Sequence, residues 1–497
     1  MSRPDFPDGW EVKNLEDCVE ILDRHRDPIN SNQREQRLEG VSEDERIPYY
    51  GATGQVGWID DYLFDEELVL LGEDGAPFID PTRPTAYIIR GKSWVNNHAH
   101  VLKGKDDVLE NKFLMHYLNT VEYKEYITGT TRYKLNQTRM REIPVPVPSL
   151  DIQKQISYKI EELFSKLDSG VKDLKDTEQR LELYKRAVLK AAMEGDLTKE
   201  TRGATSVEGS SYLEKILEHR RERWNEEFQE VFKYSGKEYE EPESVDPPEN
   251  IQIPNEWTWG SINQISYVVG GLTKNKSKRE DYSTEVPYLR VANVYANELD
   301  LEKVKTIKIS ERERNTKMLQ EGDLLVVEGN GSKSQIGRVA MWDGSISPIS
   351  HQNHLIKIRI LPQELRKFVV YWMLSPVGRK TIVNVASSTS GLHTLSISKV
   401  RSIPVPIPPA KEAKKIVKEI EQRMTIADQV LKDIKKENER SGYLRQSILT
   451  HAFEGNLMPH DQGSELQLQT SESYKSENKS SNPEGQLTLS EVTKDAE

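Results

Sequence analysis

The chain has 497 residues, of which 35% are hydrophobic and 30% charged, and its formal net charge is −12. This length leaves room for two or more domains, and no segment reaches the roughly 18 apolar residues of a membrane span. The single cysteine, Cys18, excludes an internal disulfide and a cysteine-based zinc site. With no signal-peptide pattern at the N-terminus, these features predict a cytoplasmic protein without a membrane partner.

The acidic charge is concentrated in two segments. Residues 198–253 contain 14 acidic and 8 basic side chains, and residues 458–497 contain 8 and 3. Removing these excesses of six and five from the total leaves about −1 for the rest of the chain. The overall charge therefore neither supports nor excludes a nucleic-acid partner.

Residues 1–150 are predicted to form the first globular domain. It begins with the sequence FPDGWE at residues 6–11 and continues with short apolar runs between turn residues, such as Glu67–Gly72. A helix is predicted around Lys112–Val121, and the domain closes with the alternating sequence IPVPVP at Ile143–Pro148. These elements indicate a mixed α/β domain.

Residues 151–197 show helical periodicity and are predicted to form a central spacer helix. Gly170 and Thr177 interrupt the apolar stripe, and Gly195 suits the left-handed conformation at a helix end. About 40 helical residues would extend for about 60 Å. The predicted seam, at heptad positions a and d, consists of Ile156, Ile160, Leu163, Leu167, Leu174 and Leu181.

Residues 198–253 are predicted to be an acidic linker exposed to solvent. Gly, Ser and Thr dominate residues 200–211, a charged helical segment follows at 212–233, and Pro and Glu dominate 240–250. Such a composition is typical of a connector rather than of a packed core.

The second half of the chain repeats the first. Residues 135–197 align without a gap to residues 395–457, with 21 identities in 63 positions. The second copy contains IPVPIP at Ile403–Pro408, and the phrase IPNEWT at 253–258 corresponds to the opening of the first copy. We therefore predict a second α/β domain at 254–410, with a strand at Gly322–Val327 and a helix at Lys367–Leu374. The ends of the repeated unit are alike, whereas its middle has diverged.

Residues 411–457 are predicted to form a C-terminal spacer helix, followed by a disordered polar tail at 458–497. Two helices of equal length in one chain are expected to pack antiparallel, and the polar interruptions Glu437 and Ser441 leave surface for partners. The fold class is therefore α+β: two α/β globular domains separated by two long antiparallel coiled-coil helices, with a pseudo-two-fold internal repeat. The predicted seam of the second helix consists of Ile416, Ile420, Ala427, Val430, Ile434, Leu444 and Ile448.

Candidate catalytic motifs are incomplete. Asp246–Glu249 (DPPE) is similar to the D-P-P-aromatic motif of amino methyltransferases, but glutamate replaces the aromatic residue. Gly329–Ser334 is similar to a phosphate-binding loop but lacks its first glycine, which favours a turn or a DNA-facing loop. Neither half has a glycine-rich dinucleotide or S-adenosylmethionine fingerprint. We therefore expect no catalysis and no cofactor in this chain.

Two further patterns could suggest a metal or an acid site. His98 and His100 would share one face of a strand, but no third ligand is evident. Glu73 and Asp74 lie between Gly72 and Gly75, so that a turn explains them more simply. We predict no metal site.

The order of these segments resembles the specificity subunit of type I restriction-modification enzymes over about 400 residues. The resemblance rests on the two proline strips, on the helices that end in A-x-E-G-[DN]-L, and on short strings in both domains. These strings are Tyr49–Gly54, Gly72–Gly75, Gly322–Leu325 and His351–His354.

The resemblance implies a non-catalytic protein whose two domains each read one half of a split double-stranded DNA site. The helices would set the spacer and dock two methyltransferase subunits, which bind S-adenosylmethionine and methylate adenine. Separate restriction subunits, which act as motor and nuclease, would use ATP and Mg. Because the two domains differ, the target should be asymmetric. The alternative is a coiled-coil scaffold that organises partners without binding DNA; a fused restriction and methylation enzyme is disfavoured by the missing motifs.

DNA-reading residues are expected on exposed polar loops, since base edges are read by Arg, Lys, Asn, Gln, Ser and Thr. For each of them an ordinary solvated loop is the alternative. The candidates in the first half are Lys92, Asn96, Asn97, His98, Thr130, Thr131, Arg132 and Lys134. The candidates in the second half are Asn330, Lys333, Ser334, Gln335, Gln352, Asn353, Ser390, His393 and Thr394.

Overall fold

The computed structural model describes residues 6–202, 208–224, 239–249, 251–330, 332, 335–389 and 392–457. The predicted tail at 458–497 and parts of the predicted linker lie outside these residues. The chain divides into two compact units: unit 1 contains the residues up to Glu178 and again from Lys432, and unit 2 contains Gln179–Leu431. Within the described part of the chain, no helix combines the length and the apolar character needed to cross a membrane.

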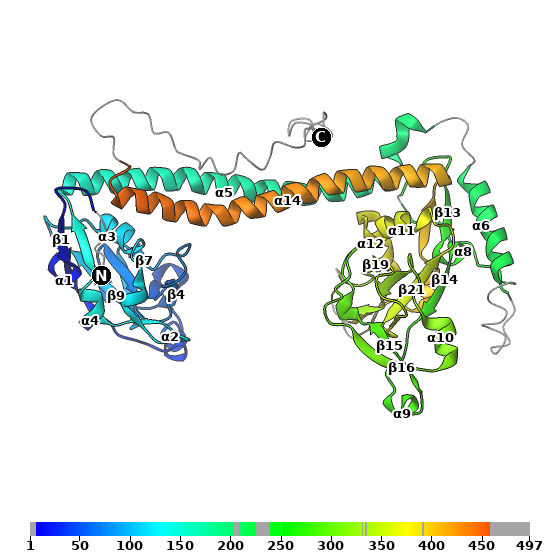
Figure 1. Ribbon diagram of the computed structural model, residues 1–497, viewed down its shortest axis with the longest axis horizontal. Helices are drawn as coiled ribbons and strands as arrows, with labels where there is room; N and C mark the ends of the chain where they lie inside the picture. The colour runs from blue at the N-terminus through cyan, green and yellow to red at the C-terminus, as the bar shows by residue number, and fades with distance from the viewer. Residues whose placement is uncertain are drawn as a thin grey trace. The chain divides into compact units, whose positions relative to one another are not determined.

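Unit 1 is a mixed α/β unit, as predicted (Figure 1). Its strands are β1 (Glu11–Asn14), β2 (Val19–Ile21), β3 (Ile47–Gly51), β4 (Gly54–Ile59), β5 (Phe64–Asp65), β6 (Leu68–Gly72), β7 (Ala86–Ile89), β8 (Lys92–Val95), β9 (Ala99–Gly104), β10 (Ile127–Thr128), β11 (Lys134–Leu135) and β12 (Pro144–Val147). Its short helices are α1 (Leu15–Cys18), α2 (Ser31–Arg37), α3 (Asn111–Leu118) and α4 (Gln137–Arg141). The described strands form sheets in the orders β2-β9-β6-β7, β4-β3-β8-β5, β1-β12 and β10-β11.

Unit 2 repeats this topology. Its strands are β13 (Thr258–Ser261), β14 (Ser266–Gly270), β15 (Thr284–Leu289), β16 (Lys305–Ile309), β17 (Leu324–Val327), β18 (Gly329–Asn330), β19 (Val339–Met341), β20 (Ser350–His351), β21 (Leu355–Ile360), β22 (Ser387–Thr389), β23 (Leu392–Thr394) and β24 (Pro404–Ile407). Its helices are α6 (Gly209–Arg223), α8 (Ile262–Ile265), α9 (Lys276–Arg279), α10 (Glu311–Lys317), α11 (Leu365–Leu374), α12 (Pro376–Val385) and α13 (Ile397–Arg401). The order β14-β21-β17-β19 matches β2-β9-β6-β7, and β16-β15-β20 matches β4-β3-β8. The middles have therefore diverged in sequence but not in topology.

The two proline strips are strands. β12 pairs antiparallel with β1, where Glu11 faces Val147, and β24 pairs with β13, where Thr258 faces Ile407. In an antiparallel pair only every second residue of a strand exchanges hydrogen bonds with the partner strand. Proline, which has no backbone N–H, is therefore tolerated at alternate positions of such a two-stranded sheet. The opening phrase of each repeat and its proline strip are thus two halves of one structural element.

The long helices are α5 (Leu150–Met193) and α14 (Ala410–Phe453), each of 44 residues. They lie antiparallel in both units: Asp168 pairs with Arg445 in unit 1, and Lys185 pairs with Asp428 at 2.9 Å in unit 2. Figure 1 shows the two helices side by side. Gly195 (φ 78°) and Gly455 (φ 79°) follow the two helices in the left-handed conformation predicted for helix ends.

Each globular core is completed by the beginning of one long helix and the end of the other. In unit 1, Ile156 of α5 and Phe453 of α14 join the core, and the Phe453 ring lies 5.1 Å from that of Phe113. In unit 2, Ile416 of α14 and Met193 of α5 occupy the corresponding positions. Both ends of each helix are therefore anchored in a packed core, and each unit contains a fixed part of both helices.

The segment predicted to be a solvated linker is in part a core element. Leu213 and Ile216 of α6 are 9% and 4% exposed and join the hydrophobic core of unit 2. Arg220 of the same helix is buried, and its guanidinium lies 4.9 Å from the centre of the Tyr267 ring. The prediction of a wholly solvated linker is therefore wrong for residues 209–223, because the side chains of Leu213, Ile216 and Arg220, spaced three and four apart, give this charged helix one buried face.

The predicted seam residues are buried or half-buried, with one exception. Leu444 is 41% exposed, so its assignment to the seam is wrong. A straight helix drifts by about 20° per heptad relative to a strict seven-residue repeat, and the error accumulates along five heptads. The next residue, Arg445, faces the partner helix instead, with its guanidinium carbon 4.8 Å from the centre of the Phe164 ring.

Candidate nucleic-acid interface

Three loops of unit 1 meet at the end of strand β6, and we call residues 72–75, 96–98 and 130–135 the three-loop junction. The Glu73 amide donates a hydrogen bond to the His98 carbonyl (2.8 Å), and the Leu135 amide donates to the Glu73 carbonyl (2.8 Å). The Gly75 amide donates to the Tyr133 carbonyl at 3.0 Å. Residues 72–75 are therefore the central strip of the junction, with a predicted reading loop on each side.

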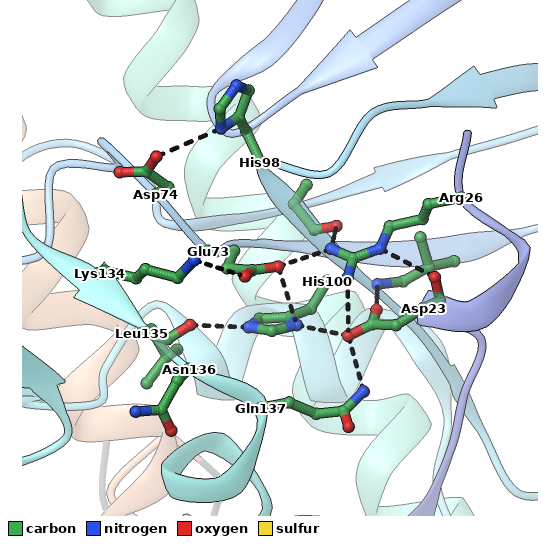
Figure 2. Close-up of polar contacts among 12 residues, drawn as sticks. Asp23, Arg26, Glu73, Asp74, His98, His100, Lys134, Leu135, Asn136 and Gln137 are labelled. Atoms are coloured by element: carbon green, nitrogen blue, oxygen red, sulfur yellow. Dashed lines mark hydrogen bonds and ion pairs between the residues drawn. The ribbon is translucent and has the colours of Figure 1, made fainter. Parts of the chain in front are cut away.

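Ion pairs bring three predicted DNA-binding residues together at this junction, and Figure 2 shows two of them, His98 and Lys134. Arg132 Nε lies 2.7 Å from Asp74 Oδ1, and His98 Nδ1 lies 3.4 Å from Asp74 Oδ2. Lys134 Nζ lies 3.2 Å from Glu73 Oε1. The two carboxylates that the sequence attributed only to a turn thus organise the basic side chains around them.

A second layer of charge lies deeper. Asp23, Glu73 and His100 bring their ligand atoms within 4.8 Å of one another, which could suit a metal ion. However, Arg26 Nη1 lies 2.7 Å from Glu73 Oε2, and Arg26 Nη2 lies 3.4 Å from Asp23 Oδ2. His100 also contacts Asp23 at 2.7 Å and the Leu135 carbonyl at 2.9 Å (Figure 2). The guanidinium supplies the positive charge that these carboxylates require, so a network of ion pairs accounts for the cluster.

The ionisation of Asp23 reflects this network. Burial raises its pKa, but the hydrogen bond and charge of His100 oppose the burial, as do the Val101 amide and the Arg26 charge. The resulting pKa lies below the ordinary value of an aspartate. Asp23 is therefore an anion that binds three neighbouring elements of unit 1 together.

Other predicted residues of unit 1 lie at or near the junction with different exposure. Asn97, Thr130 and Thr131 are exposed. Asn96 is only 9% exposed, and its Oδ1 accepts a 2.9 Å hydrogen bond from the His98 amide. Asn96 is therefore not exposed as predicted, and its side chain holds the loop in shape.

Lys92 is separate from the junction. It begins strand β8, which ends at Val95 immediately before the junction loop. Its ammonium lies 4.7 Å from the centre of the Tyr62 ring. Lys92 is thus exposed, but the structure does not bring it together with His98 and Arg132.

Unit 2 has the same backbone framework at the corresponding place. The Glu328 amide donates to the His354 carbonyl at 3.0 Å, and the Leu395 amide donates to the Glu328 carbonyl at 2.7 Å. His354 Nδ1 lies 3.3 Å from Glu328 Oε2. The two backbone hydrogen bonds repeat those that Glu73 makes in unit 1. The side-chain pair differs, because in unit 1 His98 pairs with Asp74.

The side chains on the shared framework differ. The bridge between residues 74 and 134 in unit 1 corresponds to the pairing of residues 329 and 394 in unit 2. Ionic side chains of unit 1 are thereby replaced by glycine, leucine and threonine. The corresponding residues, unit 1 first, are Asp74 and Gly329, Arg132 and Leu392, and Lys134 and Thr394.

The predicted residues of unit 2 are only partly described. Gln352 and Asn353 are half-buried, and their backbone N–H groups donate to the carbonyls of Leu289 and Leu272, respectively. Gln335 is exposed in a turn. Asn330 lies in β18, and His393 and Thr394 lie in β23. Lys333, Ser334 and Ser390 lie outside the described residues.

Two buried basic groups, His351 and Lys357, lie in the strands next to Gln352 and Asn353 in the sequence. Burial, together with the charges of Lys357 and Lys317, lowers the pKa of His351 to about 3. Burial and the charge of Arg359 lower the pKa of Lys357 to about 7, and its Nζ donates to the carbonyls of Thr316 (3.2 Å) and Met318 (2.9 Å). Lys357 was not singled out in the sequence, and His351 was noted only as the first residue of the string His351–His354.

The acid residues of the junction were considered in the sequence but were attributed to a turn. A signal for them was present, since Glu73 and Asp74 interrupt a glycine-flanked string next to a fully apolar strand. Such an abrupt change from a buried strand to two carboxylates indicates the end of the strand at a polar site. What the sequence alone could not indicate is that Arg26 would pair with Glu73 and Arg132 with Asp74.

Comparisons with known proteins agree with this geometry. The family model described as "Type I restriction modification DNA specificity domain" matches residues 7–176 and 254–440. The EcoKI specificity subunit of Escherichia coli (strain K12) is 27% identical over 354 residues, which is 69% of this chain but only 65% of that relative. The EcoDI specificity subunit of Escherichia coli is 24% identical over 464 residues, covering 92% of this chain and 90% of the relative.

A solved structure shares the fold. It is described as "Structural basis underlying complex assembly and conformational transition of the type I R-M system", and it aligns over 91% of this chain and 100% of its own length with a TM-score of 0.56 at 14% identity. The family match covers both repeated halves, including the two proline strips and most of the long helices. The chain therefore belongs to the family of type I restriction-modification DNA specificity proteins.

Proposed function

We propose that this chain is the DNA sequence-recognition subunit of a type I restriction-modification complex. The observation that carries the proposal is the pair of junctions built around Glu73 and Glu328. Their backbone hydrogen bonds are the same, while the side chains that they display differ. Two units that recognise different DNA half-sites require the same backbone geometry with different surface side chains.

In this proposal each globular unit reads one half of an asymmetric, two-part site in double-stranded DNA. The helices α5 and α14 set the unread spacer and dock two methyltransferase subunits. Catalysis belongs to the partners: S-adenosylmethionine would be bound by the methyltransferase subunits, and ATP and Mg by the restriction subunits. The chain itself would perform no chemistry, and its place would be the cytoplasm.

The test is to produce the chain together with its methyltransferase subunits in a host without other adenine methylation. Sequencing of modified bases should then reveal methyladenine in one asymmetric motif with two parts. Gel shifts with that duplex and with a random-sequence duplex should show preference for the motif. A complex that binds both duplexes equally, or neither, would contradict the proposal and favour a scaffold.

Single substitutions can show which unit recognises which half-site. Arg132→Ala in unit 1 should relax the sequence preference in one half of the motif only. Gln335→Ala in unit 2, which changes an exposed side chain on a turn, should affect at most the other half. If either substitution altered both halves, the division of reading between the units would be wrong.

A further inference from the structure

The Asp74–Arg132 pair combines a fixed carboxylate with an exposed guanidinium. From this geometry we propose that Arg132 reads a guanine in the half-site of unit 1 and that Asp74 is the residue that positions it. The inference rests on the proposed function in DNA recognition and names the base chemistry that one of its sites would take.

The two layers of charge at the junction differ in exposure. The inner pair, Arg26 and Glu73, has side chains that are 14% and 13% exposed. In the outer pair, Asp74 is 23% exposed and Arg132 is 62% exposed. Buried ion pairs hold their geometry, because separating them leaves uncompensated charges, whereas exposed pairs exchange partners easily. The inner pair therefore fixes the strip that carries Asp74, and Arg132 is the member that can engage a ligand.

The orientation of Arg132 suits a two-pronged contact. Nε, at the base of the guanidinium, lies 2.7 Å from Asp74 Oδ1, so the planar group is held at its base. The guanidinium also lies against Gly75, where an added Cβ would be 3.4 Å from Arg132 Nε. Gly75 has a φ of +77°, a conformation that side chains disfavour, so this surface stays open. Asp74 and Gly75 thus restrain the guanidinium from two sides and leave its outer edge for another acceptor.

The charge of Asp74 favours a base over a phosphate as that acceptor. A phosphate bound to Arg132 would place its negative charge close to the Asp74 carboxylate, and the two would repel each other. The O6 and N7 atoms of guanine are neutral acceptors, and their spacing matches the two prongs of an arginine in the major groove. A restrained guanidinium also loses less conformational freedom when it binds. The pair is therefore better suited to guanine than to the DNA backbone.

Unit 2 provides an internal comparison. Gly329 and Leu392 occupy the positions of Asp74 and Arg132 on the same backbone framework. Unit 2 therefore has no equivalent of this pair at this position, and any guanine in its half-site must be read by other residues. The inference applies to one half of the target only.

The test uses the full chain in complex with its methyltransferase subunits and the duplex defined by sequencing of modified bases. Each position of both half-sites is changed in turn, and the dissociation constants are measured at several salt concentrations. The wild-type complex should discriminate against loss of one G·C pair in the unit 1 half-site by roughly 10-fold or more. Arg132→Ala should abolish that discrimination and leave the other positions unchanged.

Asp74→Asn separates positioning from folding. The arginine remains but loses its restraint, so discrimination at the same G·C pair should fall several-fold. Binding to random-sequence DNA should become more salt-dependent by about one phosphate contact, because the freed Arg132 can now bind the backbone. In the Arg132→Ala background, Asp74→Asn should no longer change the salt dependence. Asp74→Glu should restore part of the discrimination.

Glu66→Gln is the matched control. Like Asp74, Glu66 belongs to an ion pair, with Lys103 at 2.7 Å, but Glu66 precedes β6, whereas Asp74 follows it. This substitution removes the same charge from the same unit and should leave every base preference unchanged. A unit 1 half-site without a G·C pair, or equal weakening of all duplexes by Arg132→Ala, would overturn the inference while leaving the proposed function intact. A wild-type complex without any sequence preference would instead overturn both.

Discussion

Gln137 Nε2 donates a 2.9 Å hydrogen bond to Asp23 Oδ2 and so ties the beginning of α4 to the loop after β2. The repeat offsets place Ile397 and Gly270 at the corresponding positions of unit 2, where a Cβ added to Gly270 would lie 3.0 Å from Ile397 Cδ1. One join is therefore polar and the other apolar, although they connect the same elements. The network of buried charges around Asp23 is thus a property of unit 1 alone at this place.

We expect Arg26→Met to destabilise unit 1 by about 2–4 kcal/mol, because Asp23 and Glu73 would keep their charges without the guanidinium. Hydrogen exchange of peptides from β6 and β9 measures this loss. Arg90→Met is the control, since Arg90 is 60% exposed and forms a surface pair with Glu67, and should cost less than about 1 kcal/mol. Adding Glu73→Gln to Arg26→Met should recover part of the stability. Equal losses for the two arginines would contradict the role of the network.

Arg445→Ala should loosen the contact between the long helices in unit 1. The substitution removes both the interaction with the Phe164 ring and the ion pair with Asp168. Because Arg445 is partly exposed, the expected loss is about 1 kcal/mol. Hydrogen exchange along α14 reports it. Arg440→Ala, which breaks only a pair with Glu437 on the same helix, should have no measurable effect.

The corrected seam makes a second prediction for α14. Ile434 is 5% exposed, so Ile434→Ala should destabilise unit 1 by about 2–4 kcal/mol through the loss of buried surface. Leu444 is 41% exposed, and Leu444→Ala should change stability by less than about 1 kcal/mol. Thermal unfolding of both variants compares them directly. The strict heptad register would instead require a large effect at both positions.

Lys357 makes the stability of unit 2 depend on pH. Its pKa is about 7 in the folded chain, below the ordinary 10.5, because burial disfavours the charged amine. Between pH 7 and pH 10.5 the unfolded chain therefore binds more protons than the folded chain, and stability rises with pH over this range. Urea denaturation followed by the fluorescence of the buried Trp342 and Trp372 should show this rise.

Lys357→Met is the variant that isolates this effect. Its stability should vary less between pH 7 and pH 10 than that of the wild type. Lys357 also donates hydrogen bonds to two carbonyls, so the absolute stability of the variant is not the diagnostic quantity. Parallel pH profiles for the two proteins would show that another group is responsible.

The spacer prediction can be tested by adding one heptad to α5 between Ile156 and Val188, with a matching heptad in α14. Two equal insertions preserve the antiparallel pairing that Asp168 and Arg445 define. Methylation in the host should then report a longer spacer with both half-sites unchanged. A change in the bases recognised in either half-site would show that the helices do more than set the spacing.

The repeated frame was predictable because its signals are local. Proline at alternate positions and apolar residues at helical spacing report the backbone state of their own segment, and the helices at Lys112–Val121 and Lys367–Leu374 were found as α3 and α11 within two or three residues. The register of the second seam failed near Leu444, since small deviations from seven-residue periodicity add up over a helix of 44 residues.

The candidate site was only half predictable for a different reason. His98, Arg132 and Lys134 are the polar residues that loops display, and their types alone suggested contact with DNA. Their common partners, Glu73 and Asp74, depend on which strands become neighbours, and this pairing joins residues about 60 positions apart. Asn96 shows the converse, because its residue type suggested an exposed loop residue, whereas the structure buries it.

The burial of Leu213 and Ile216 determines where the boundary of a chimeric protein can be placed. A chimera that receives the second recognition unit from a relative would need to begin before Gly209, not at the start of the repeat near residue 254, so that α6 travels with the core it covers. If the exchanged segment began after α6, the original α6 would pack against the core of the relative, whose apolar surface does not match it. Engineering of new target specificities should therefore treat α6 as the first element of the exchanged module.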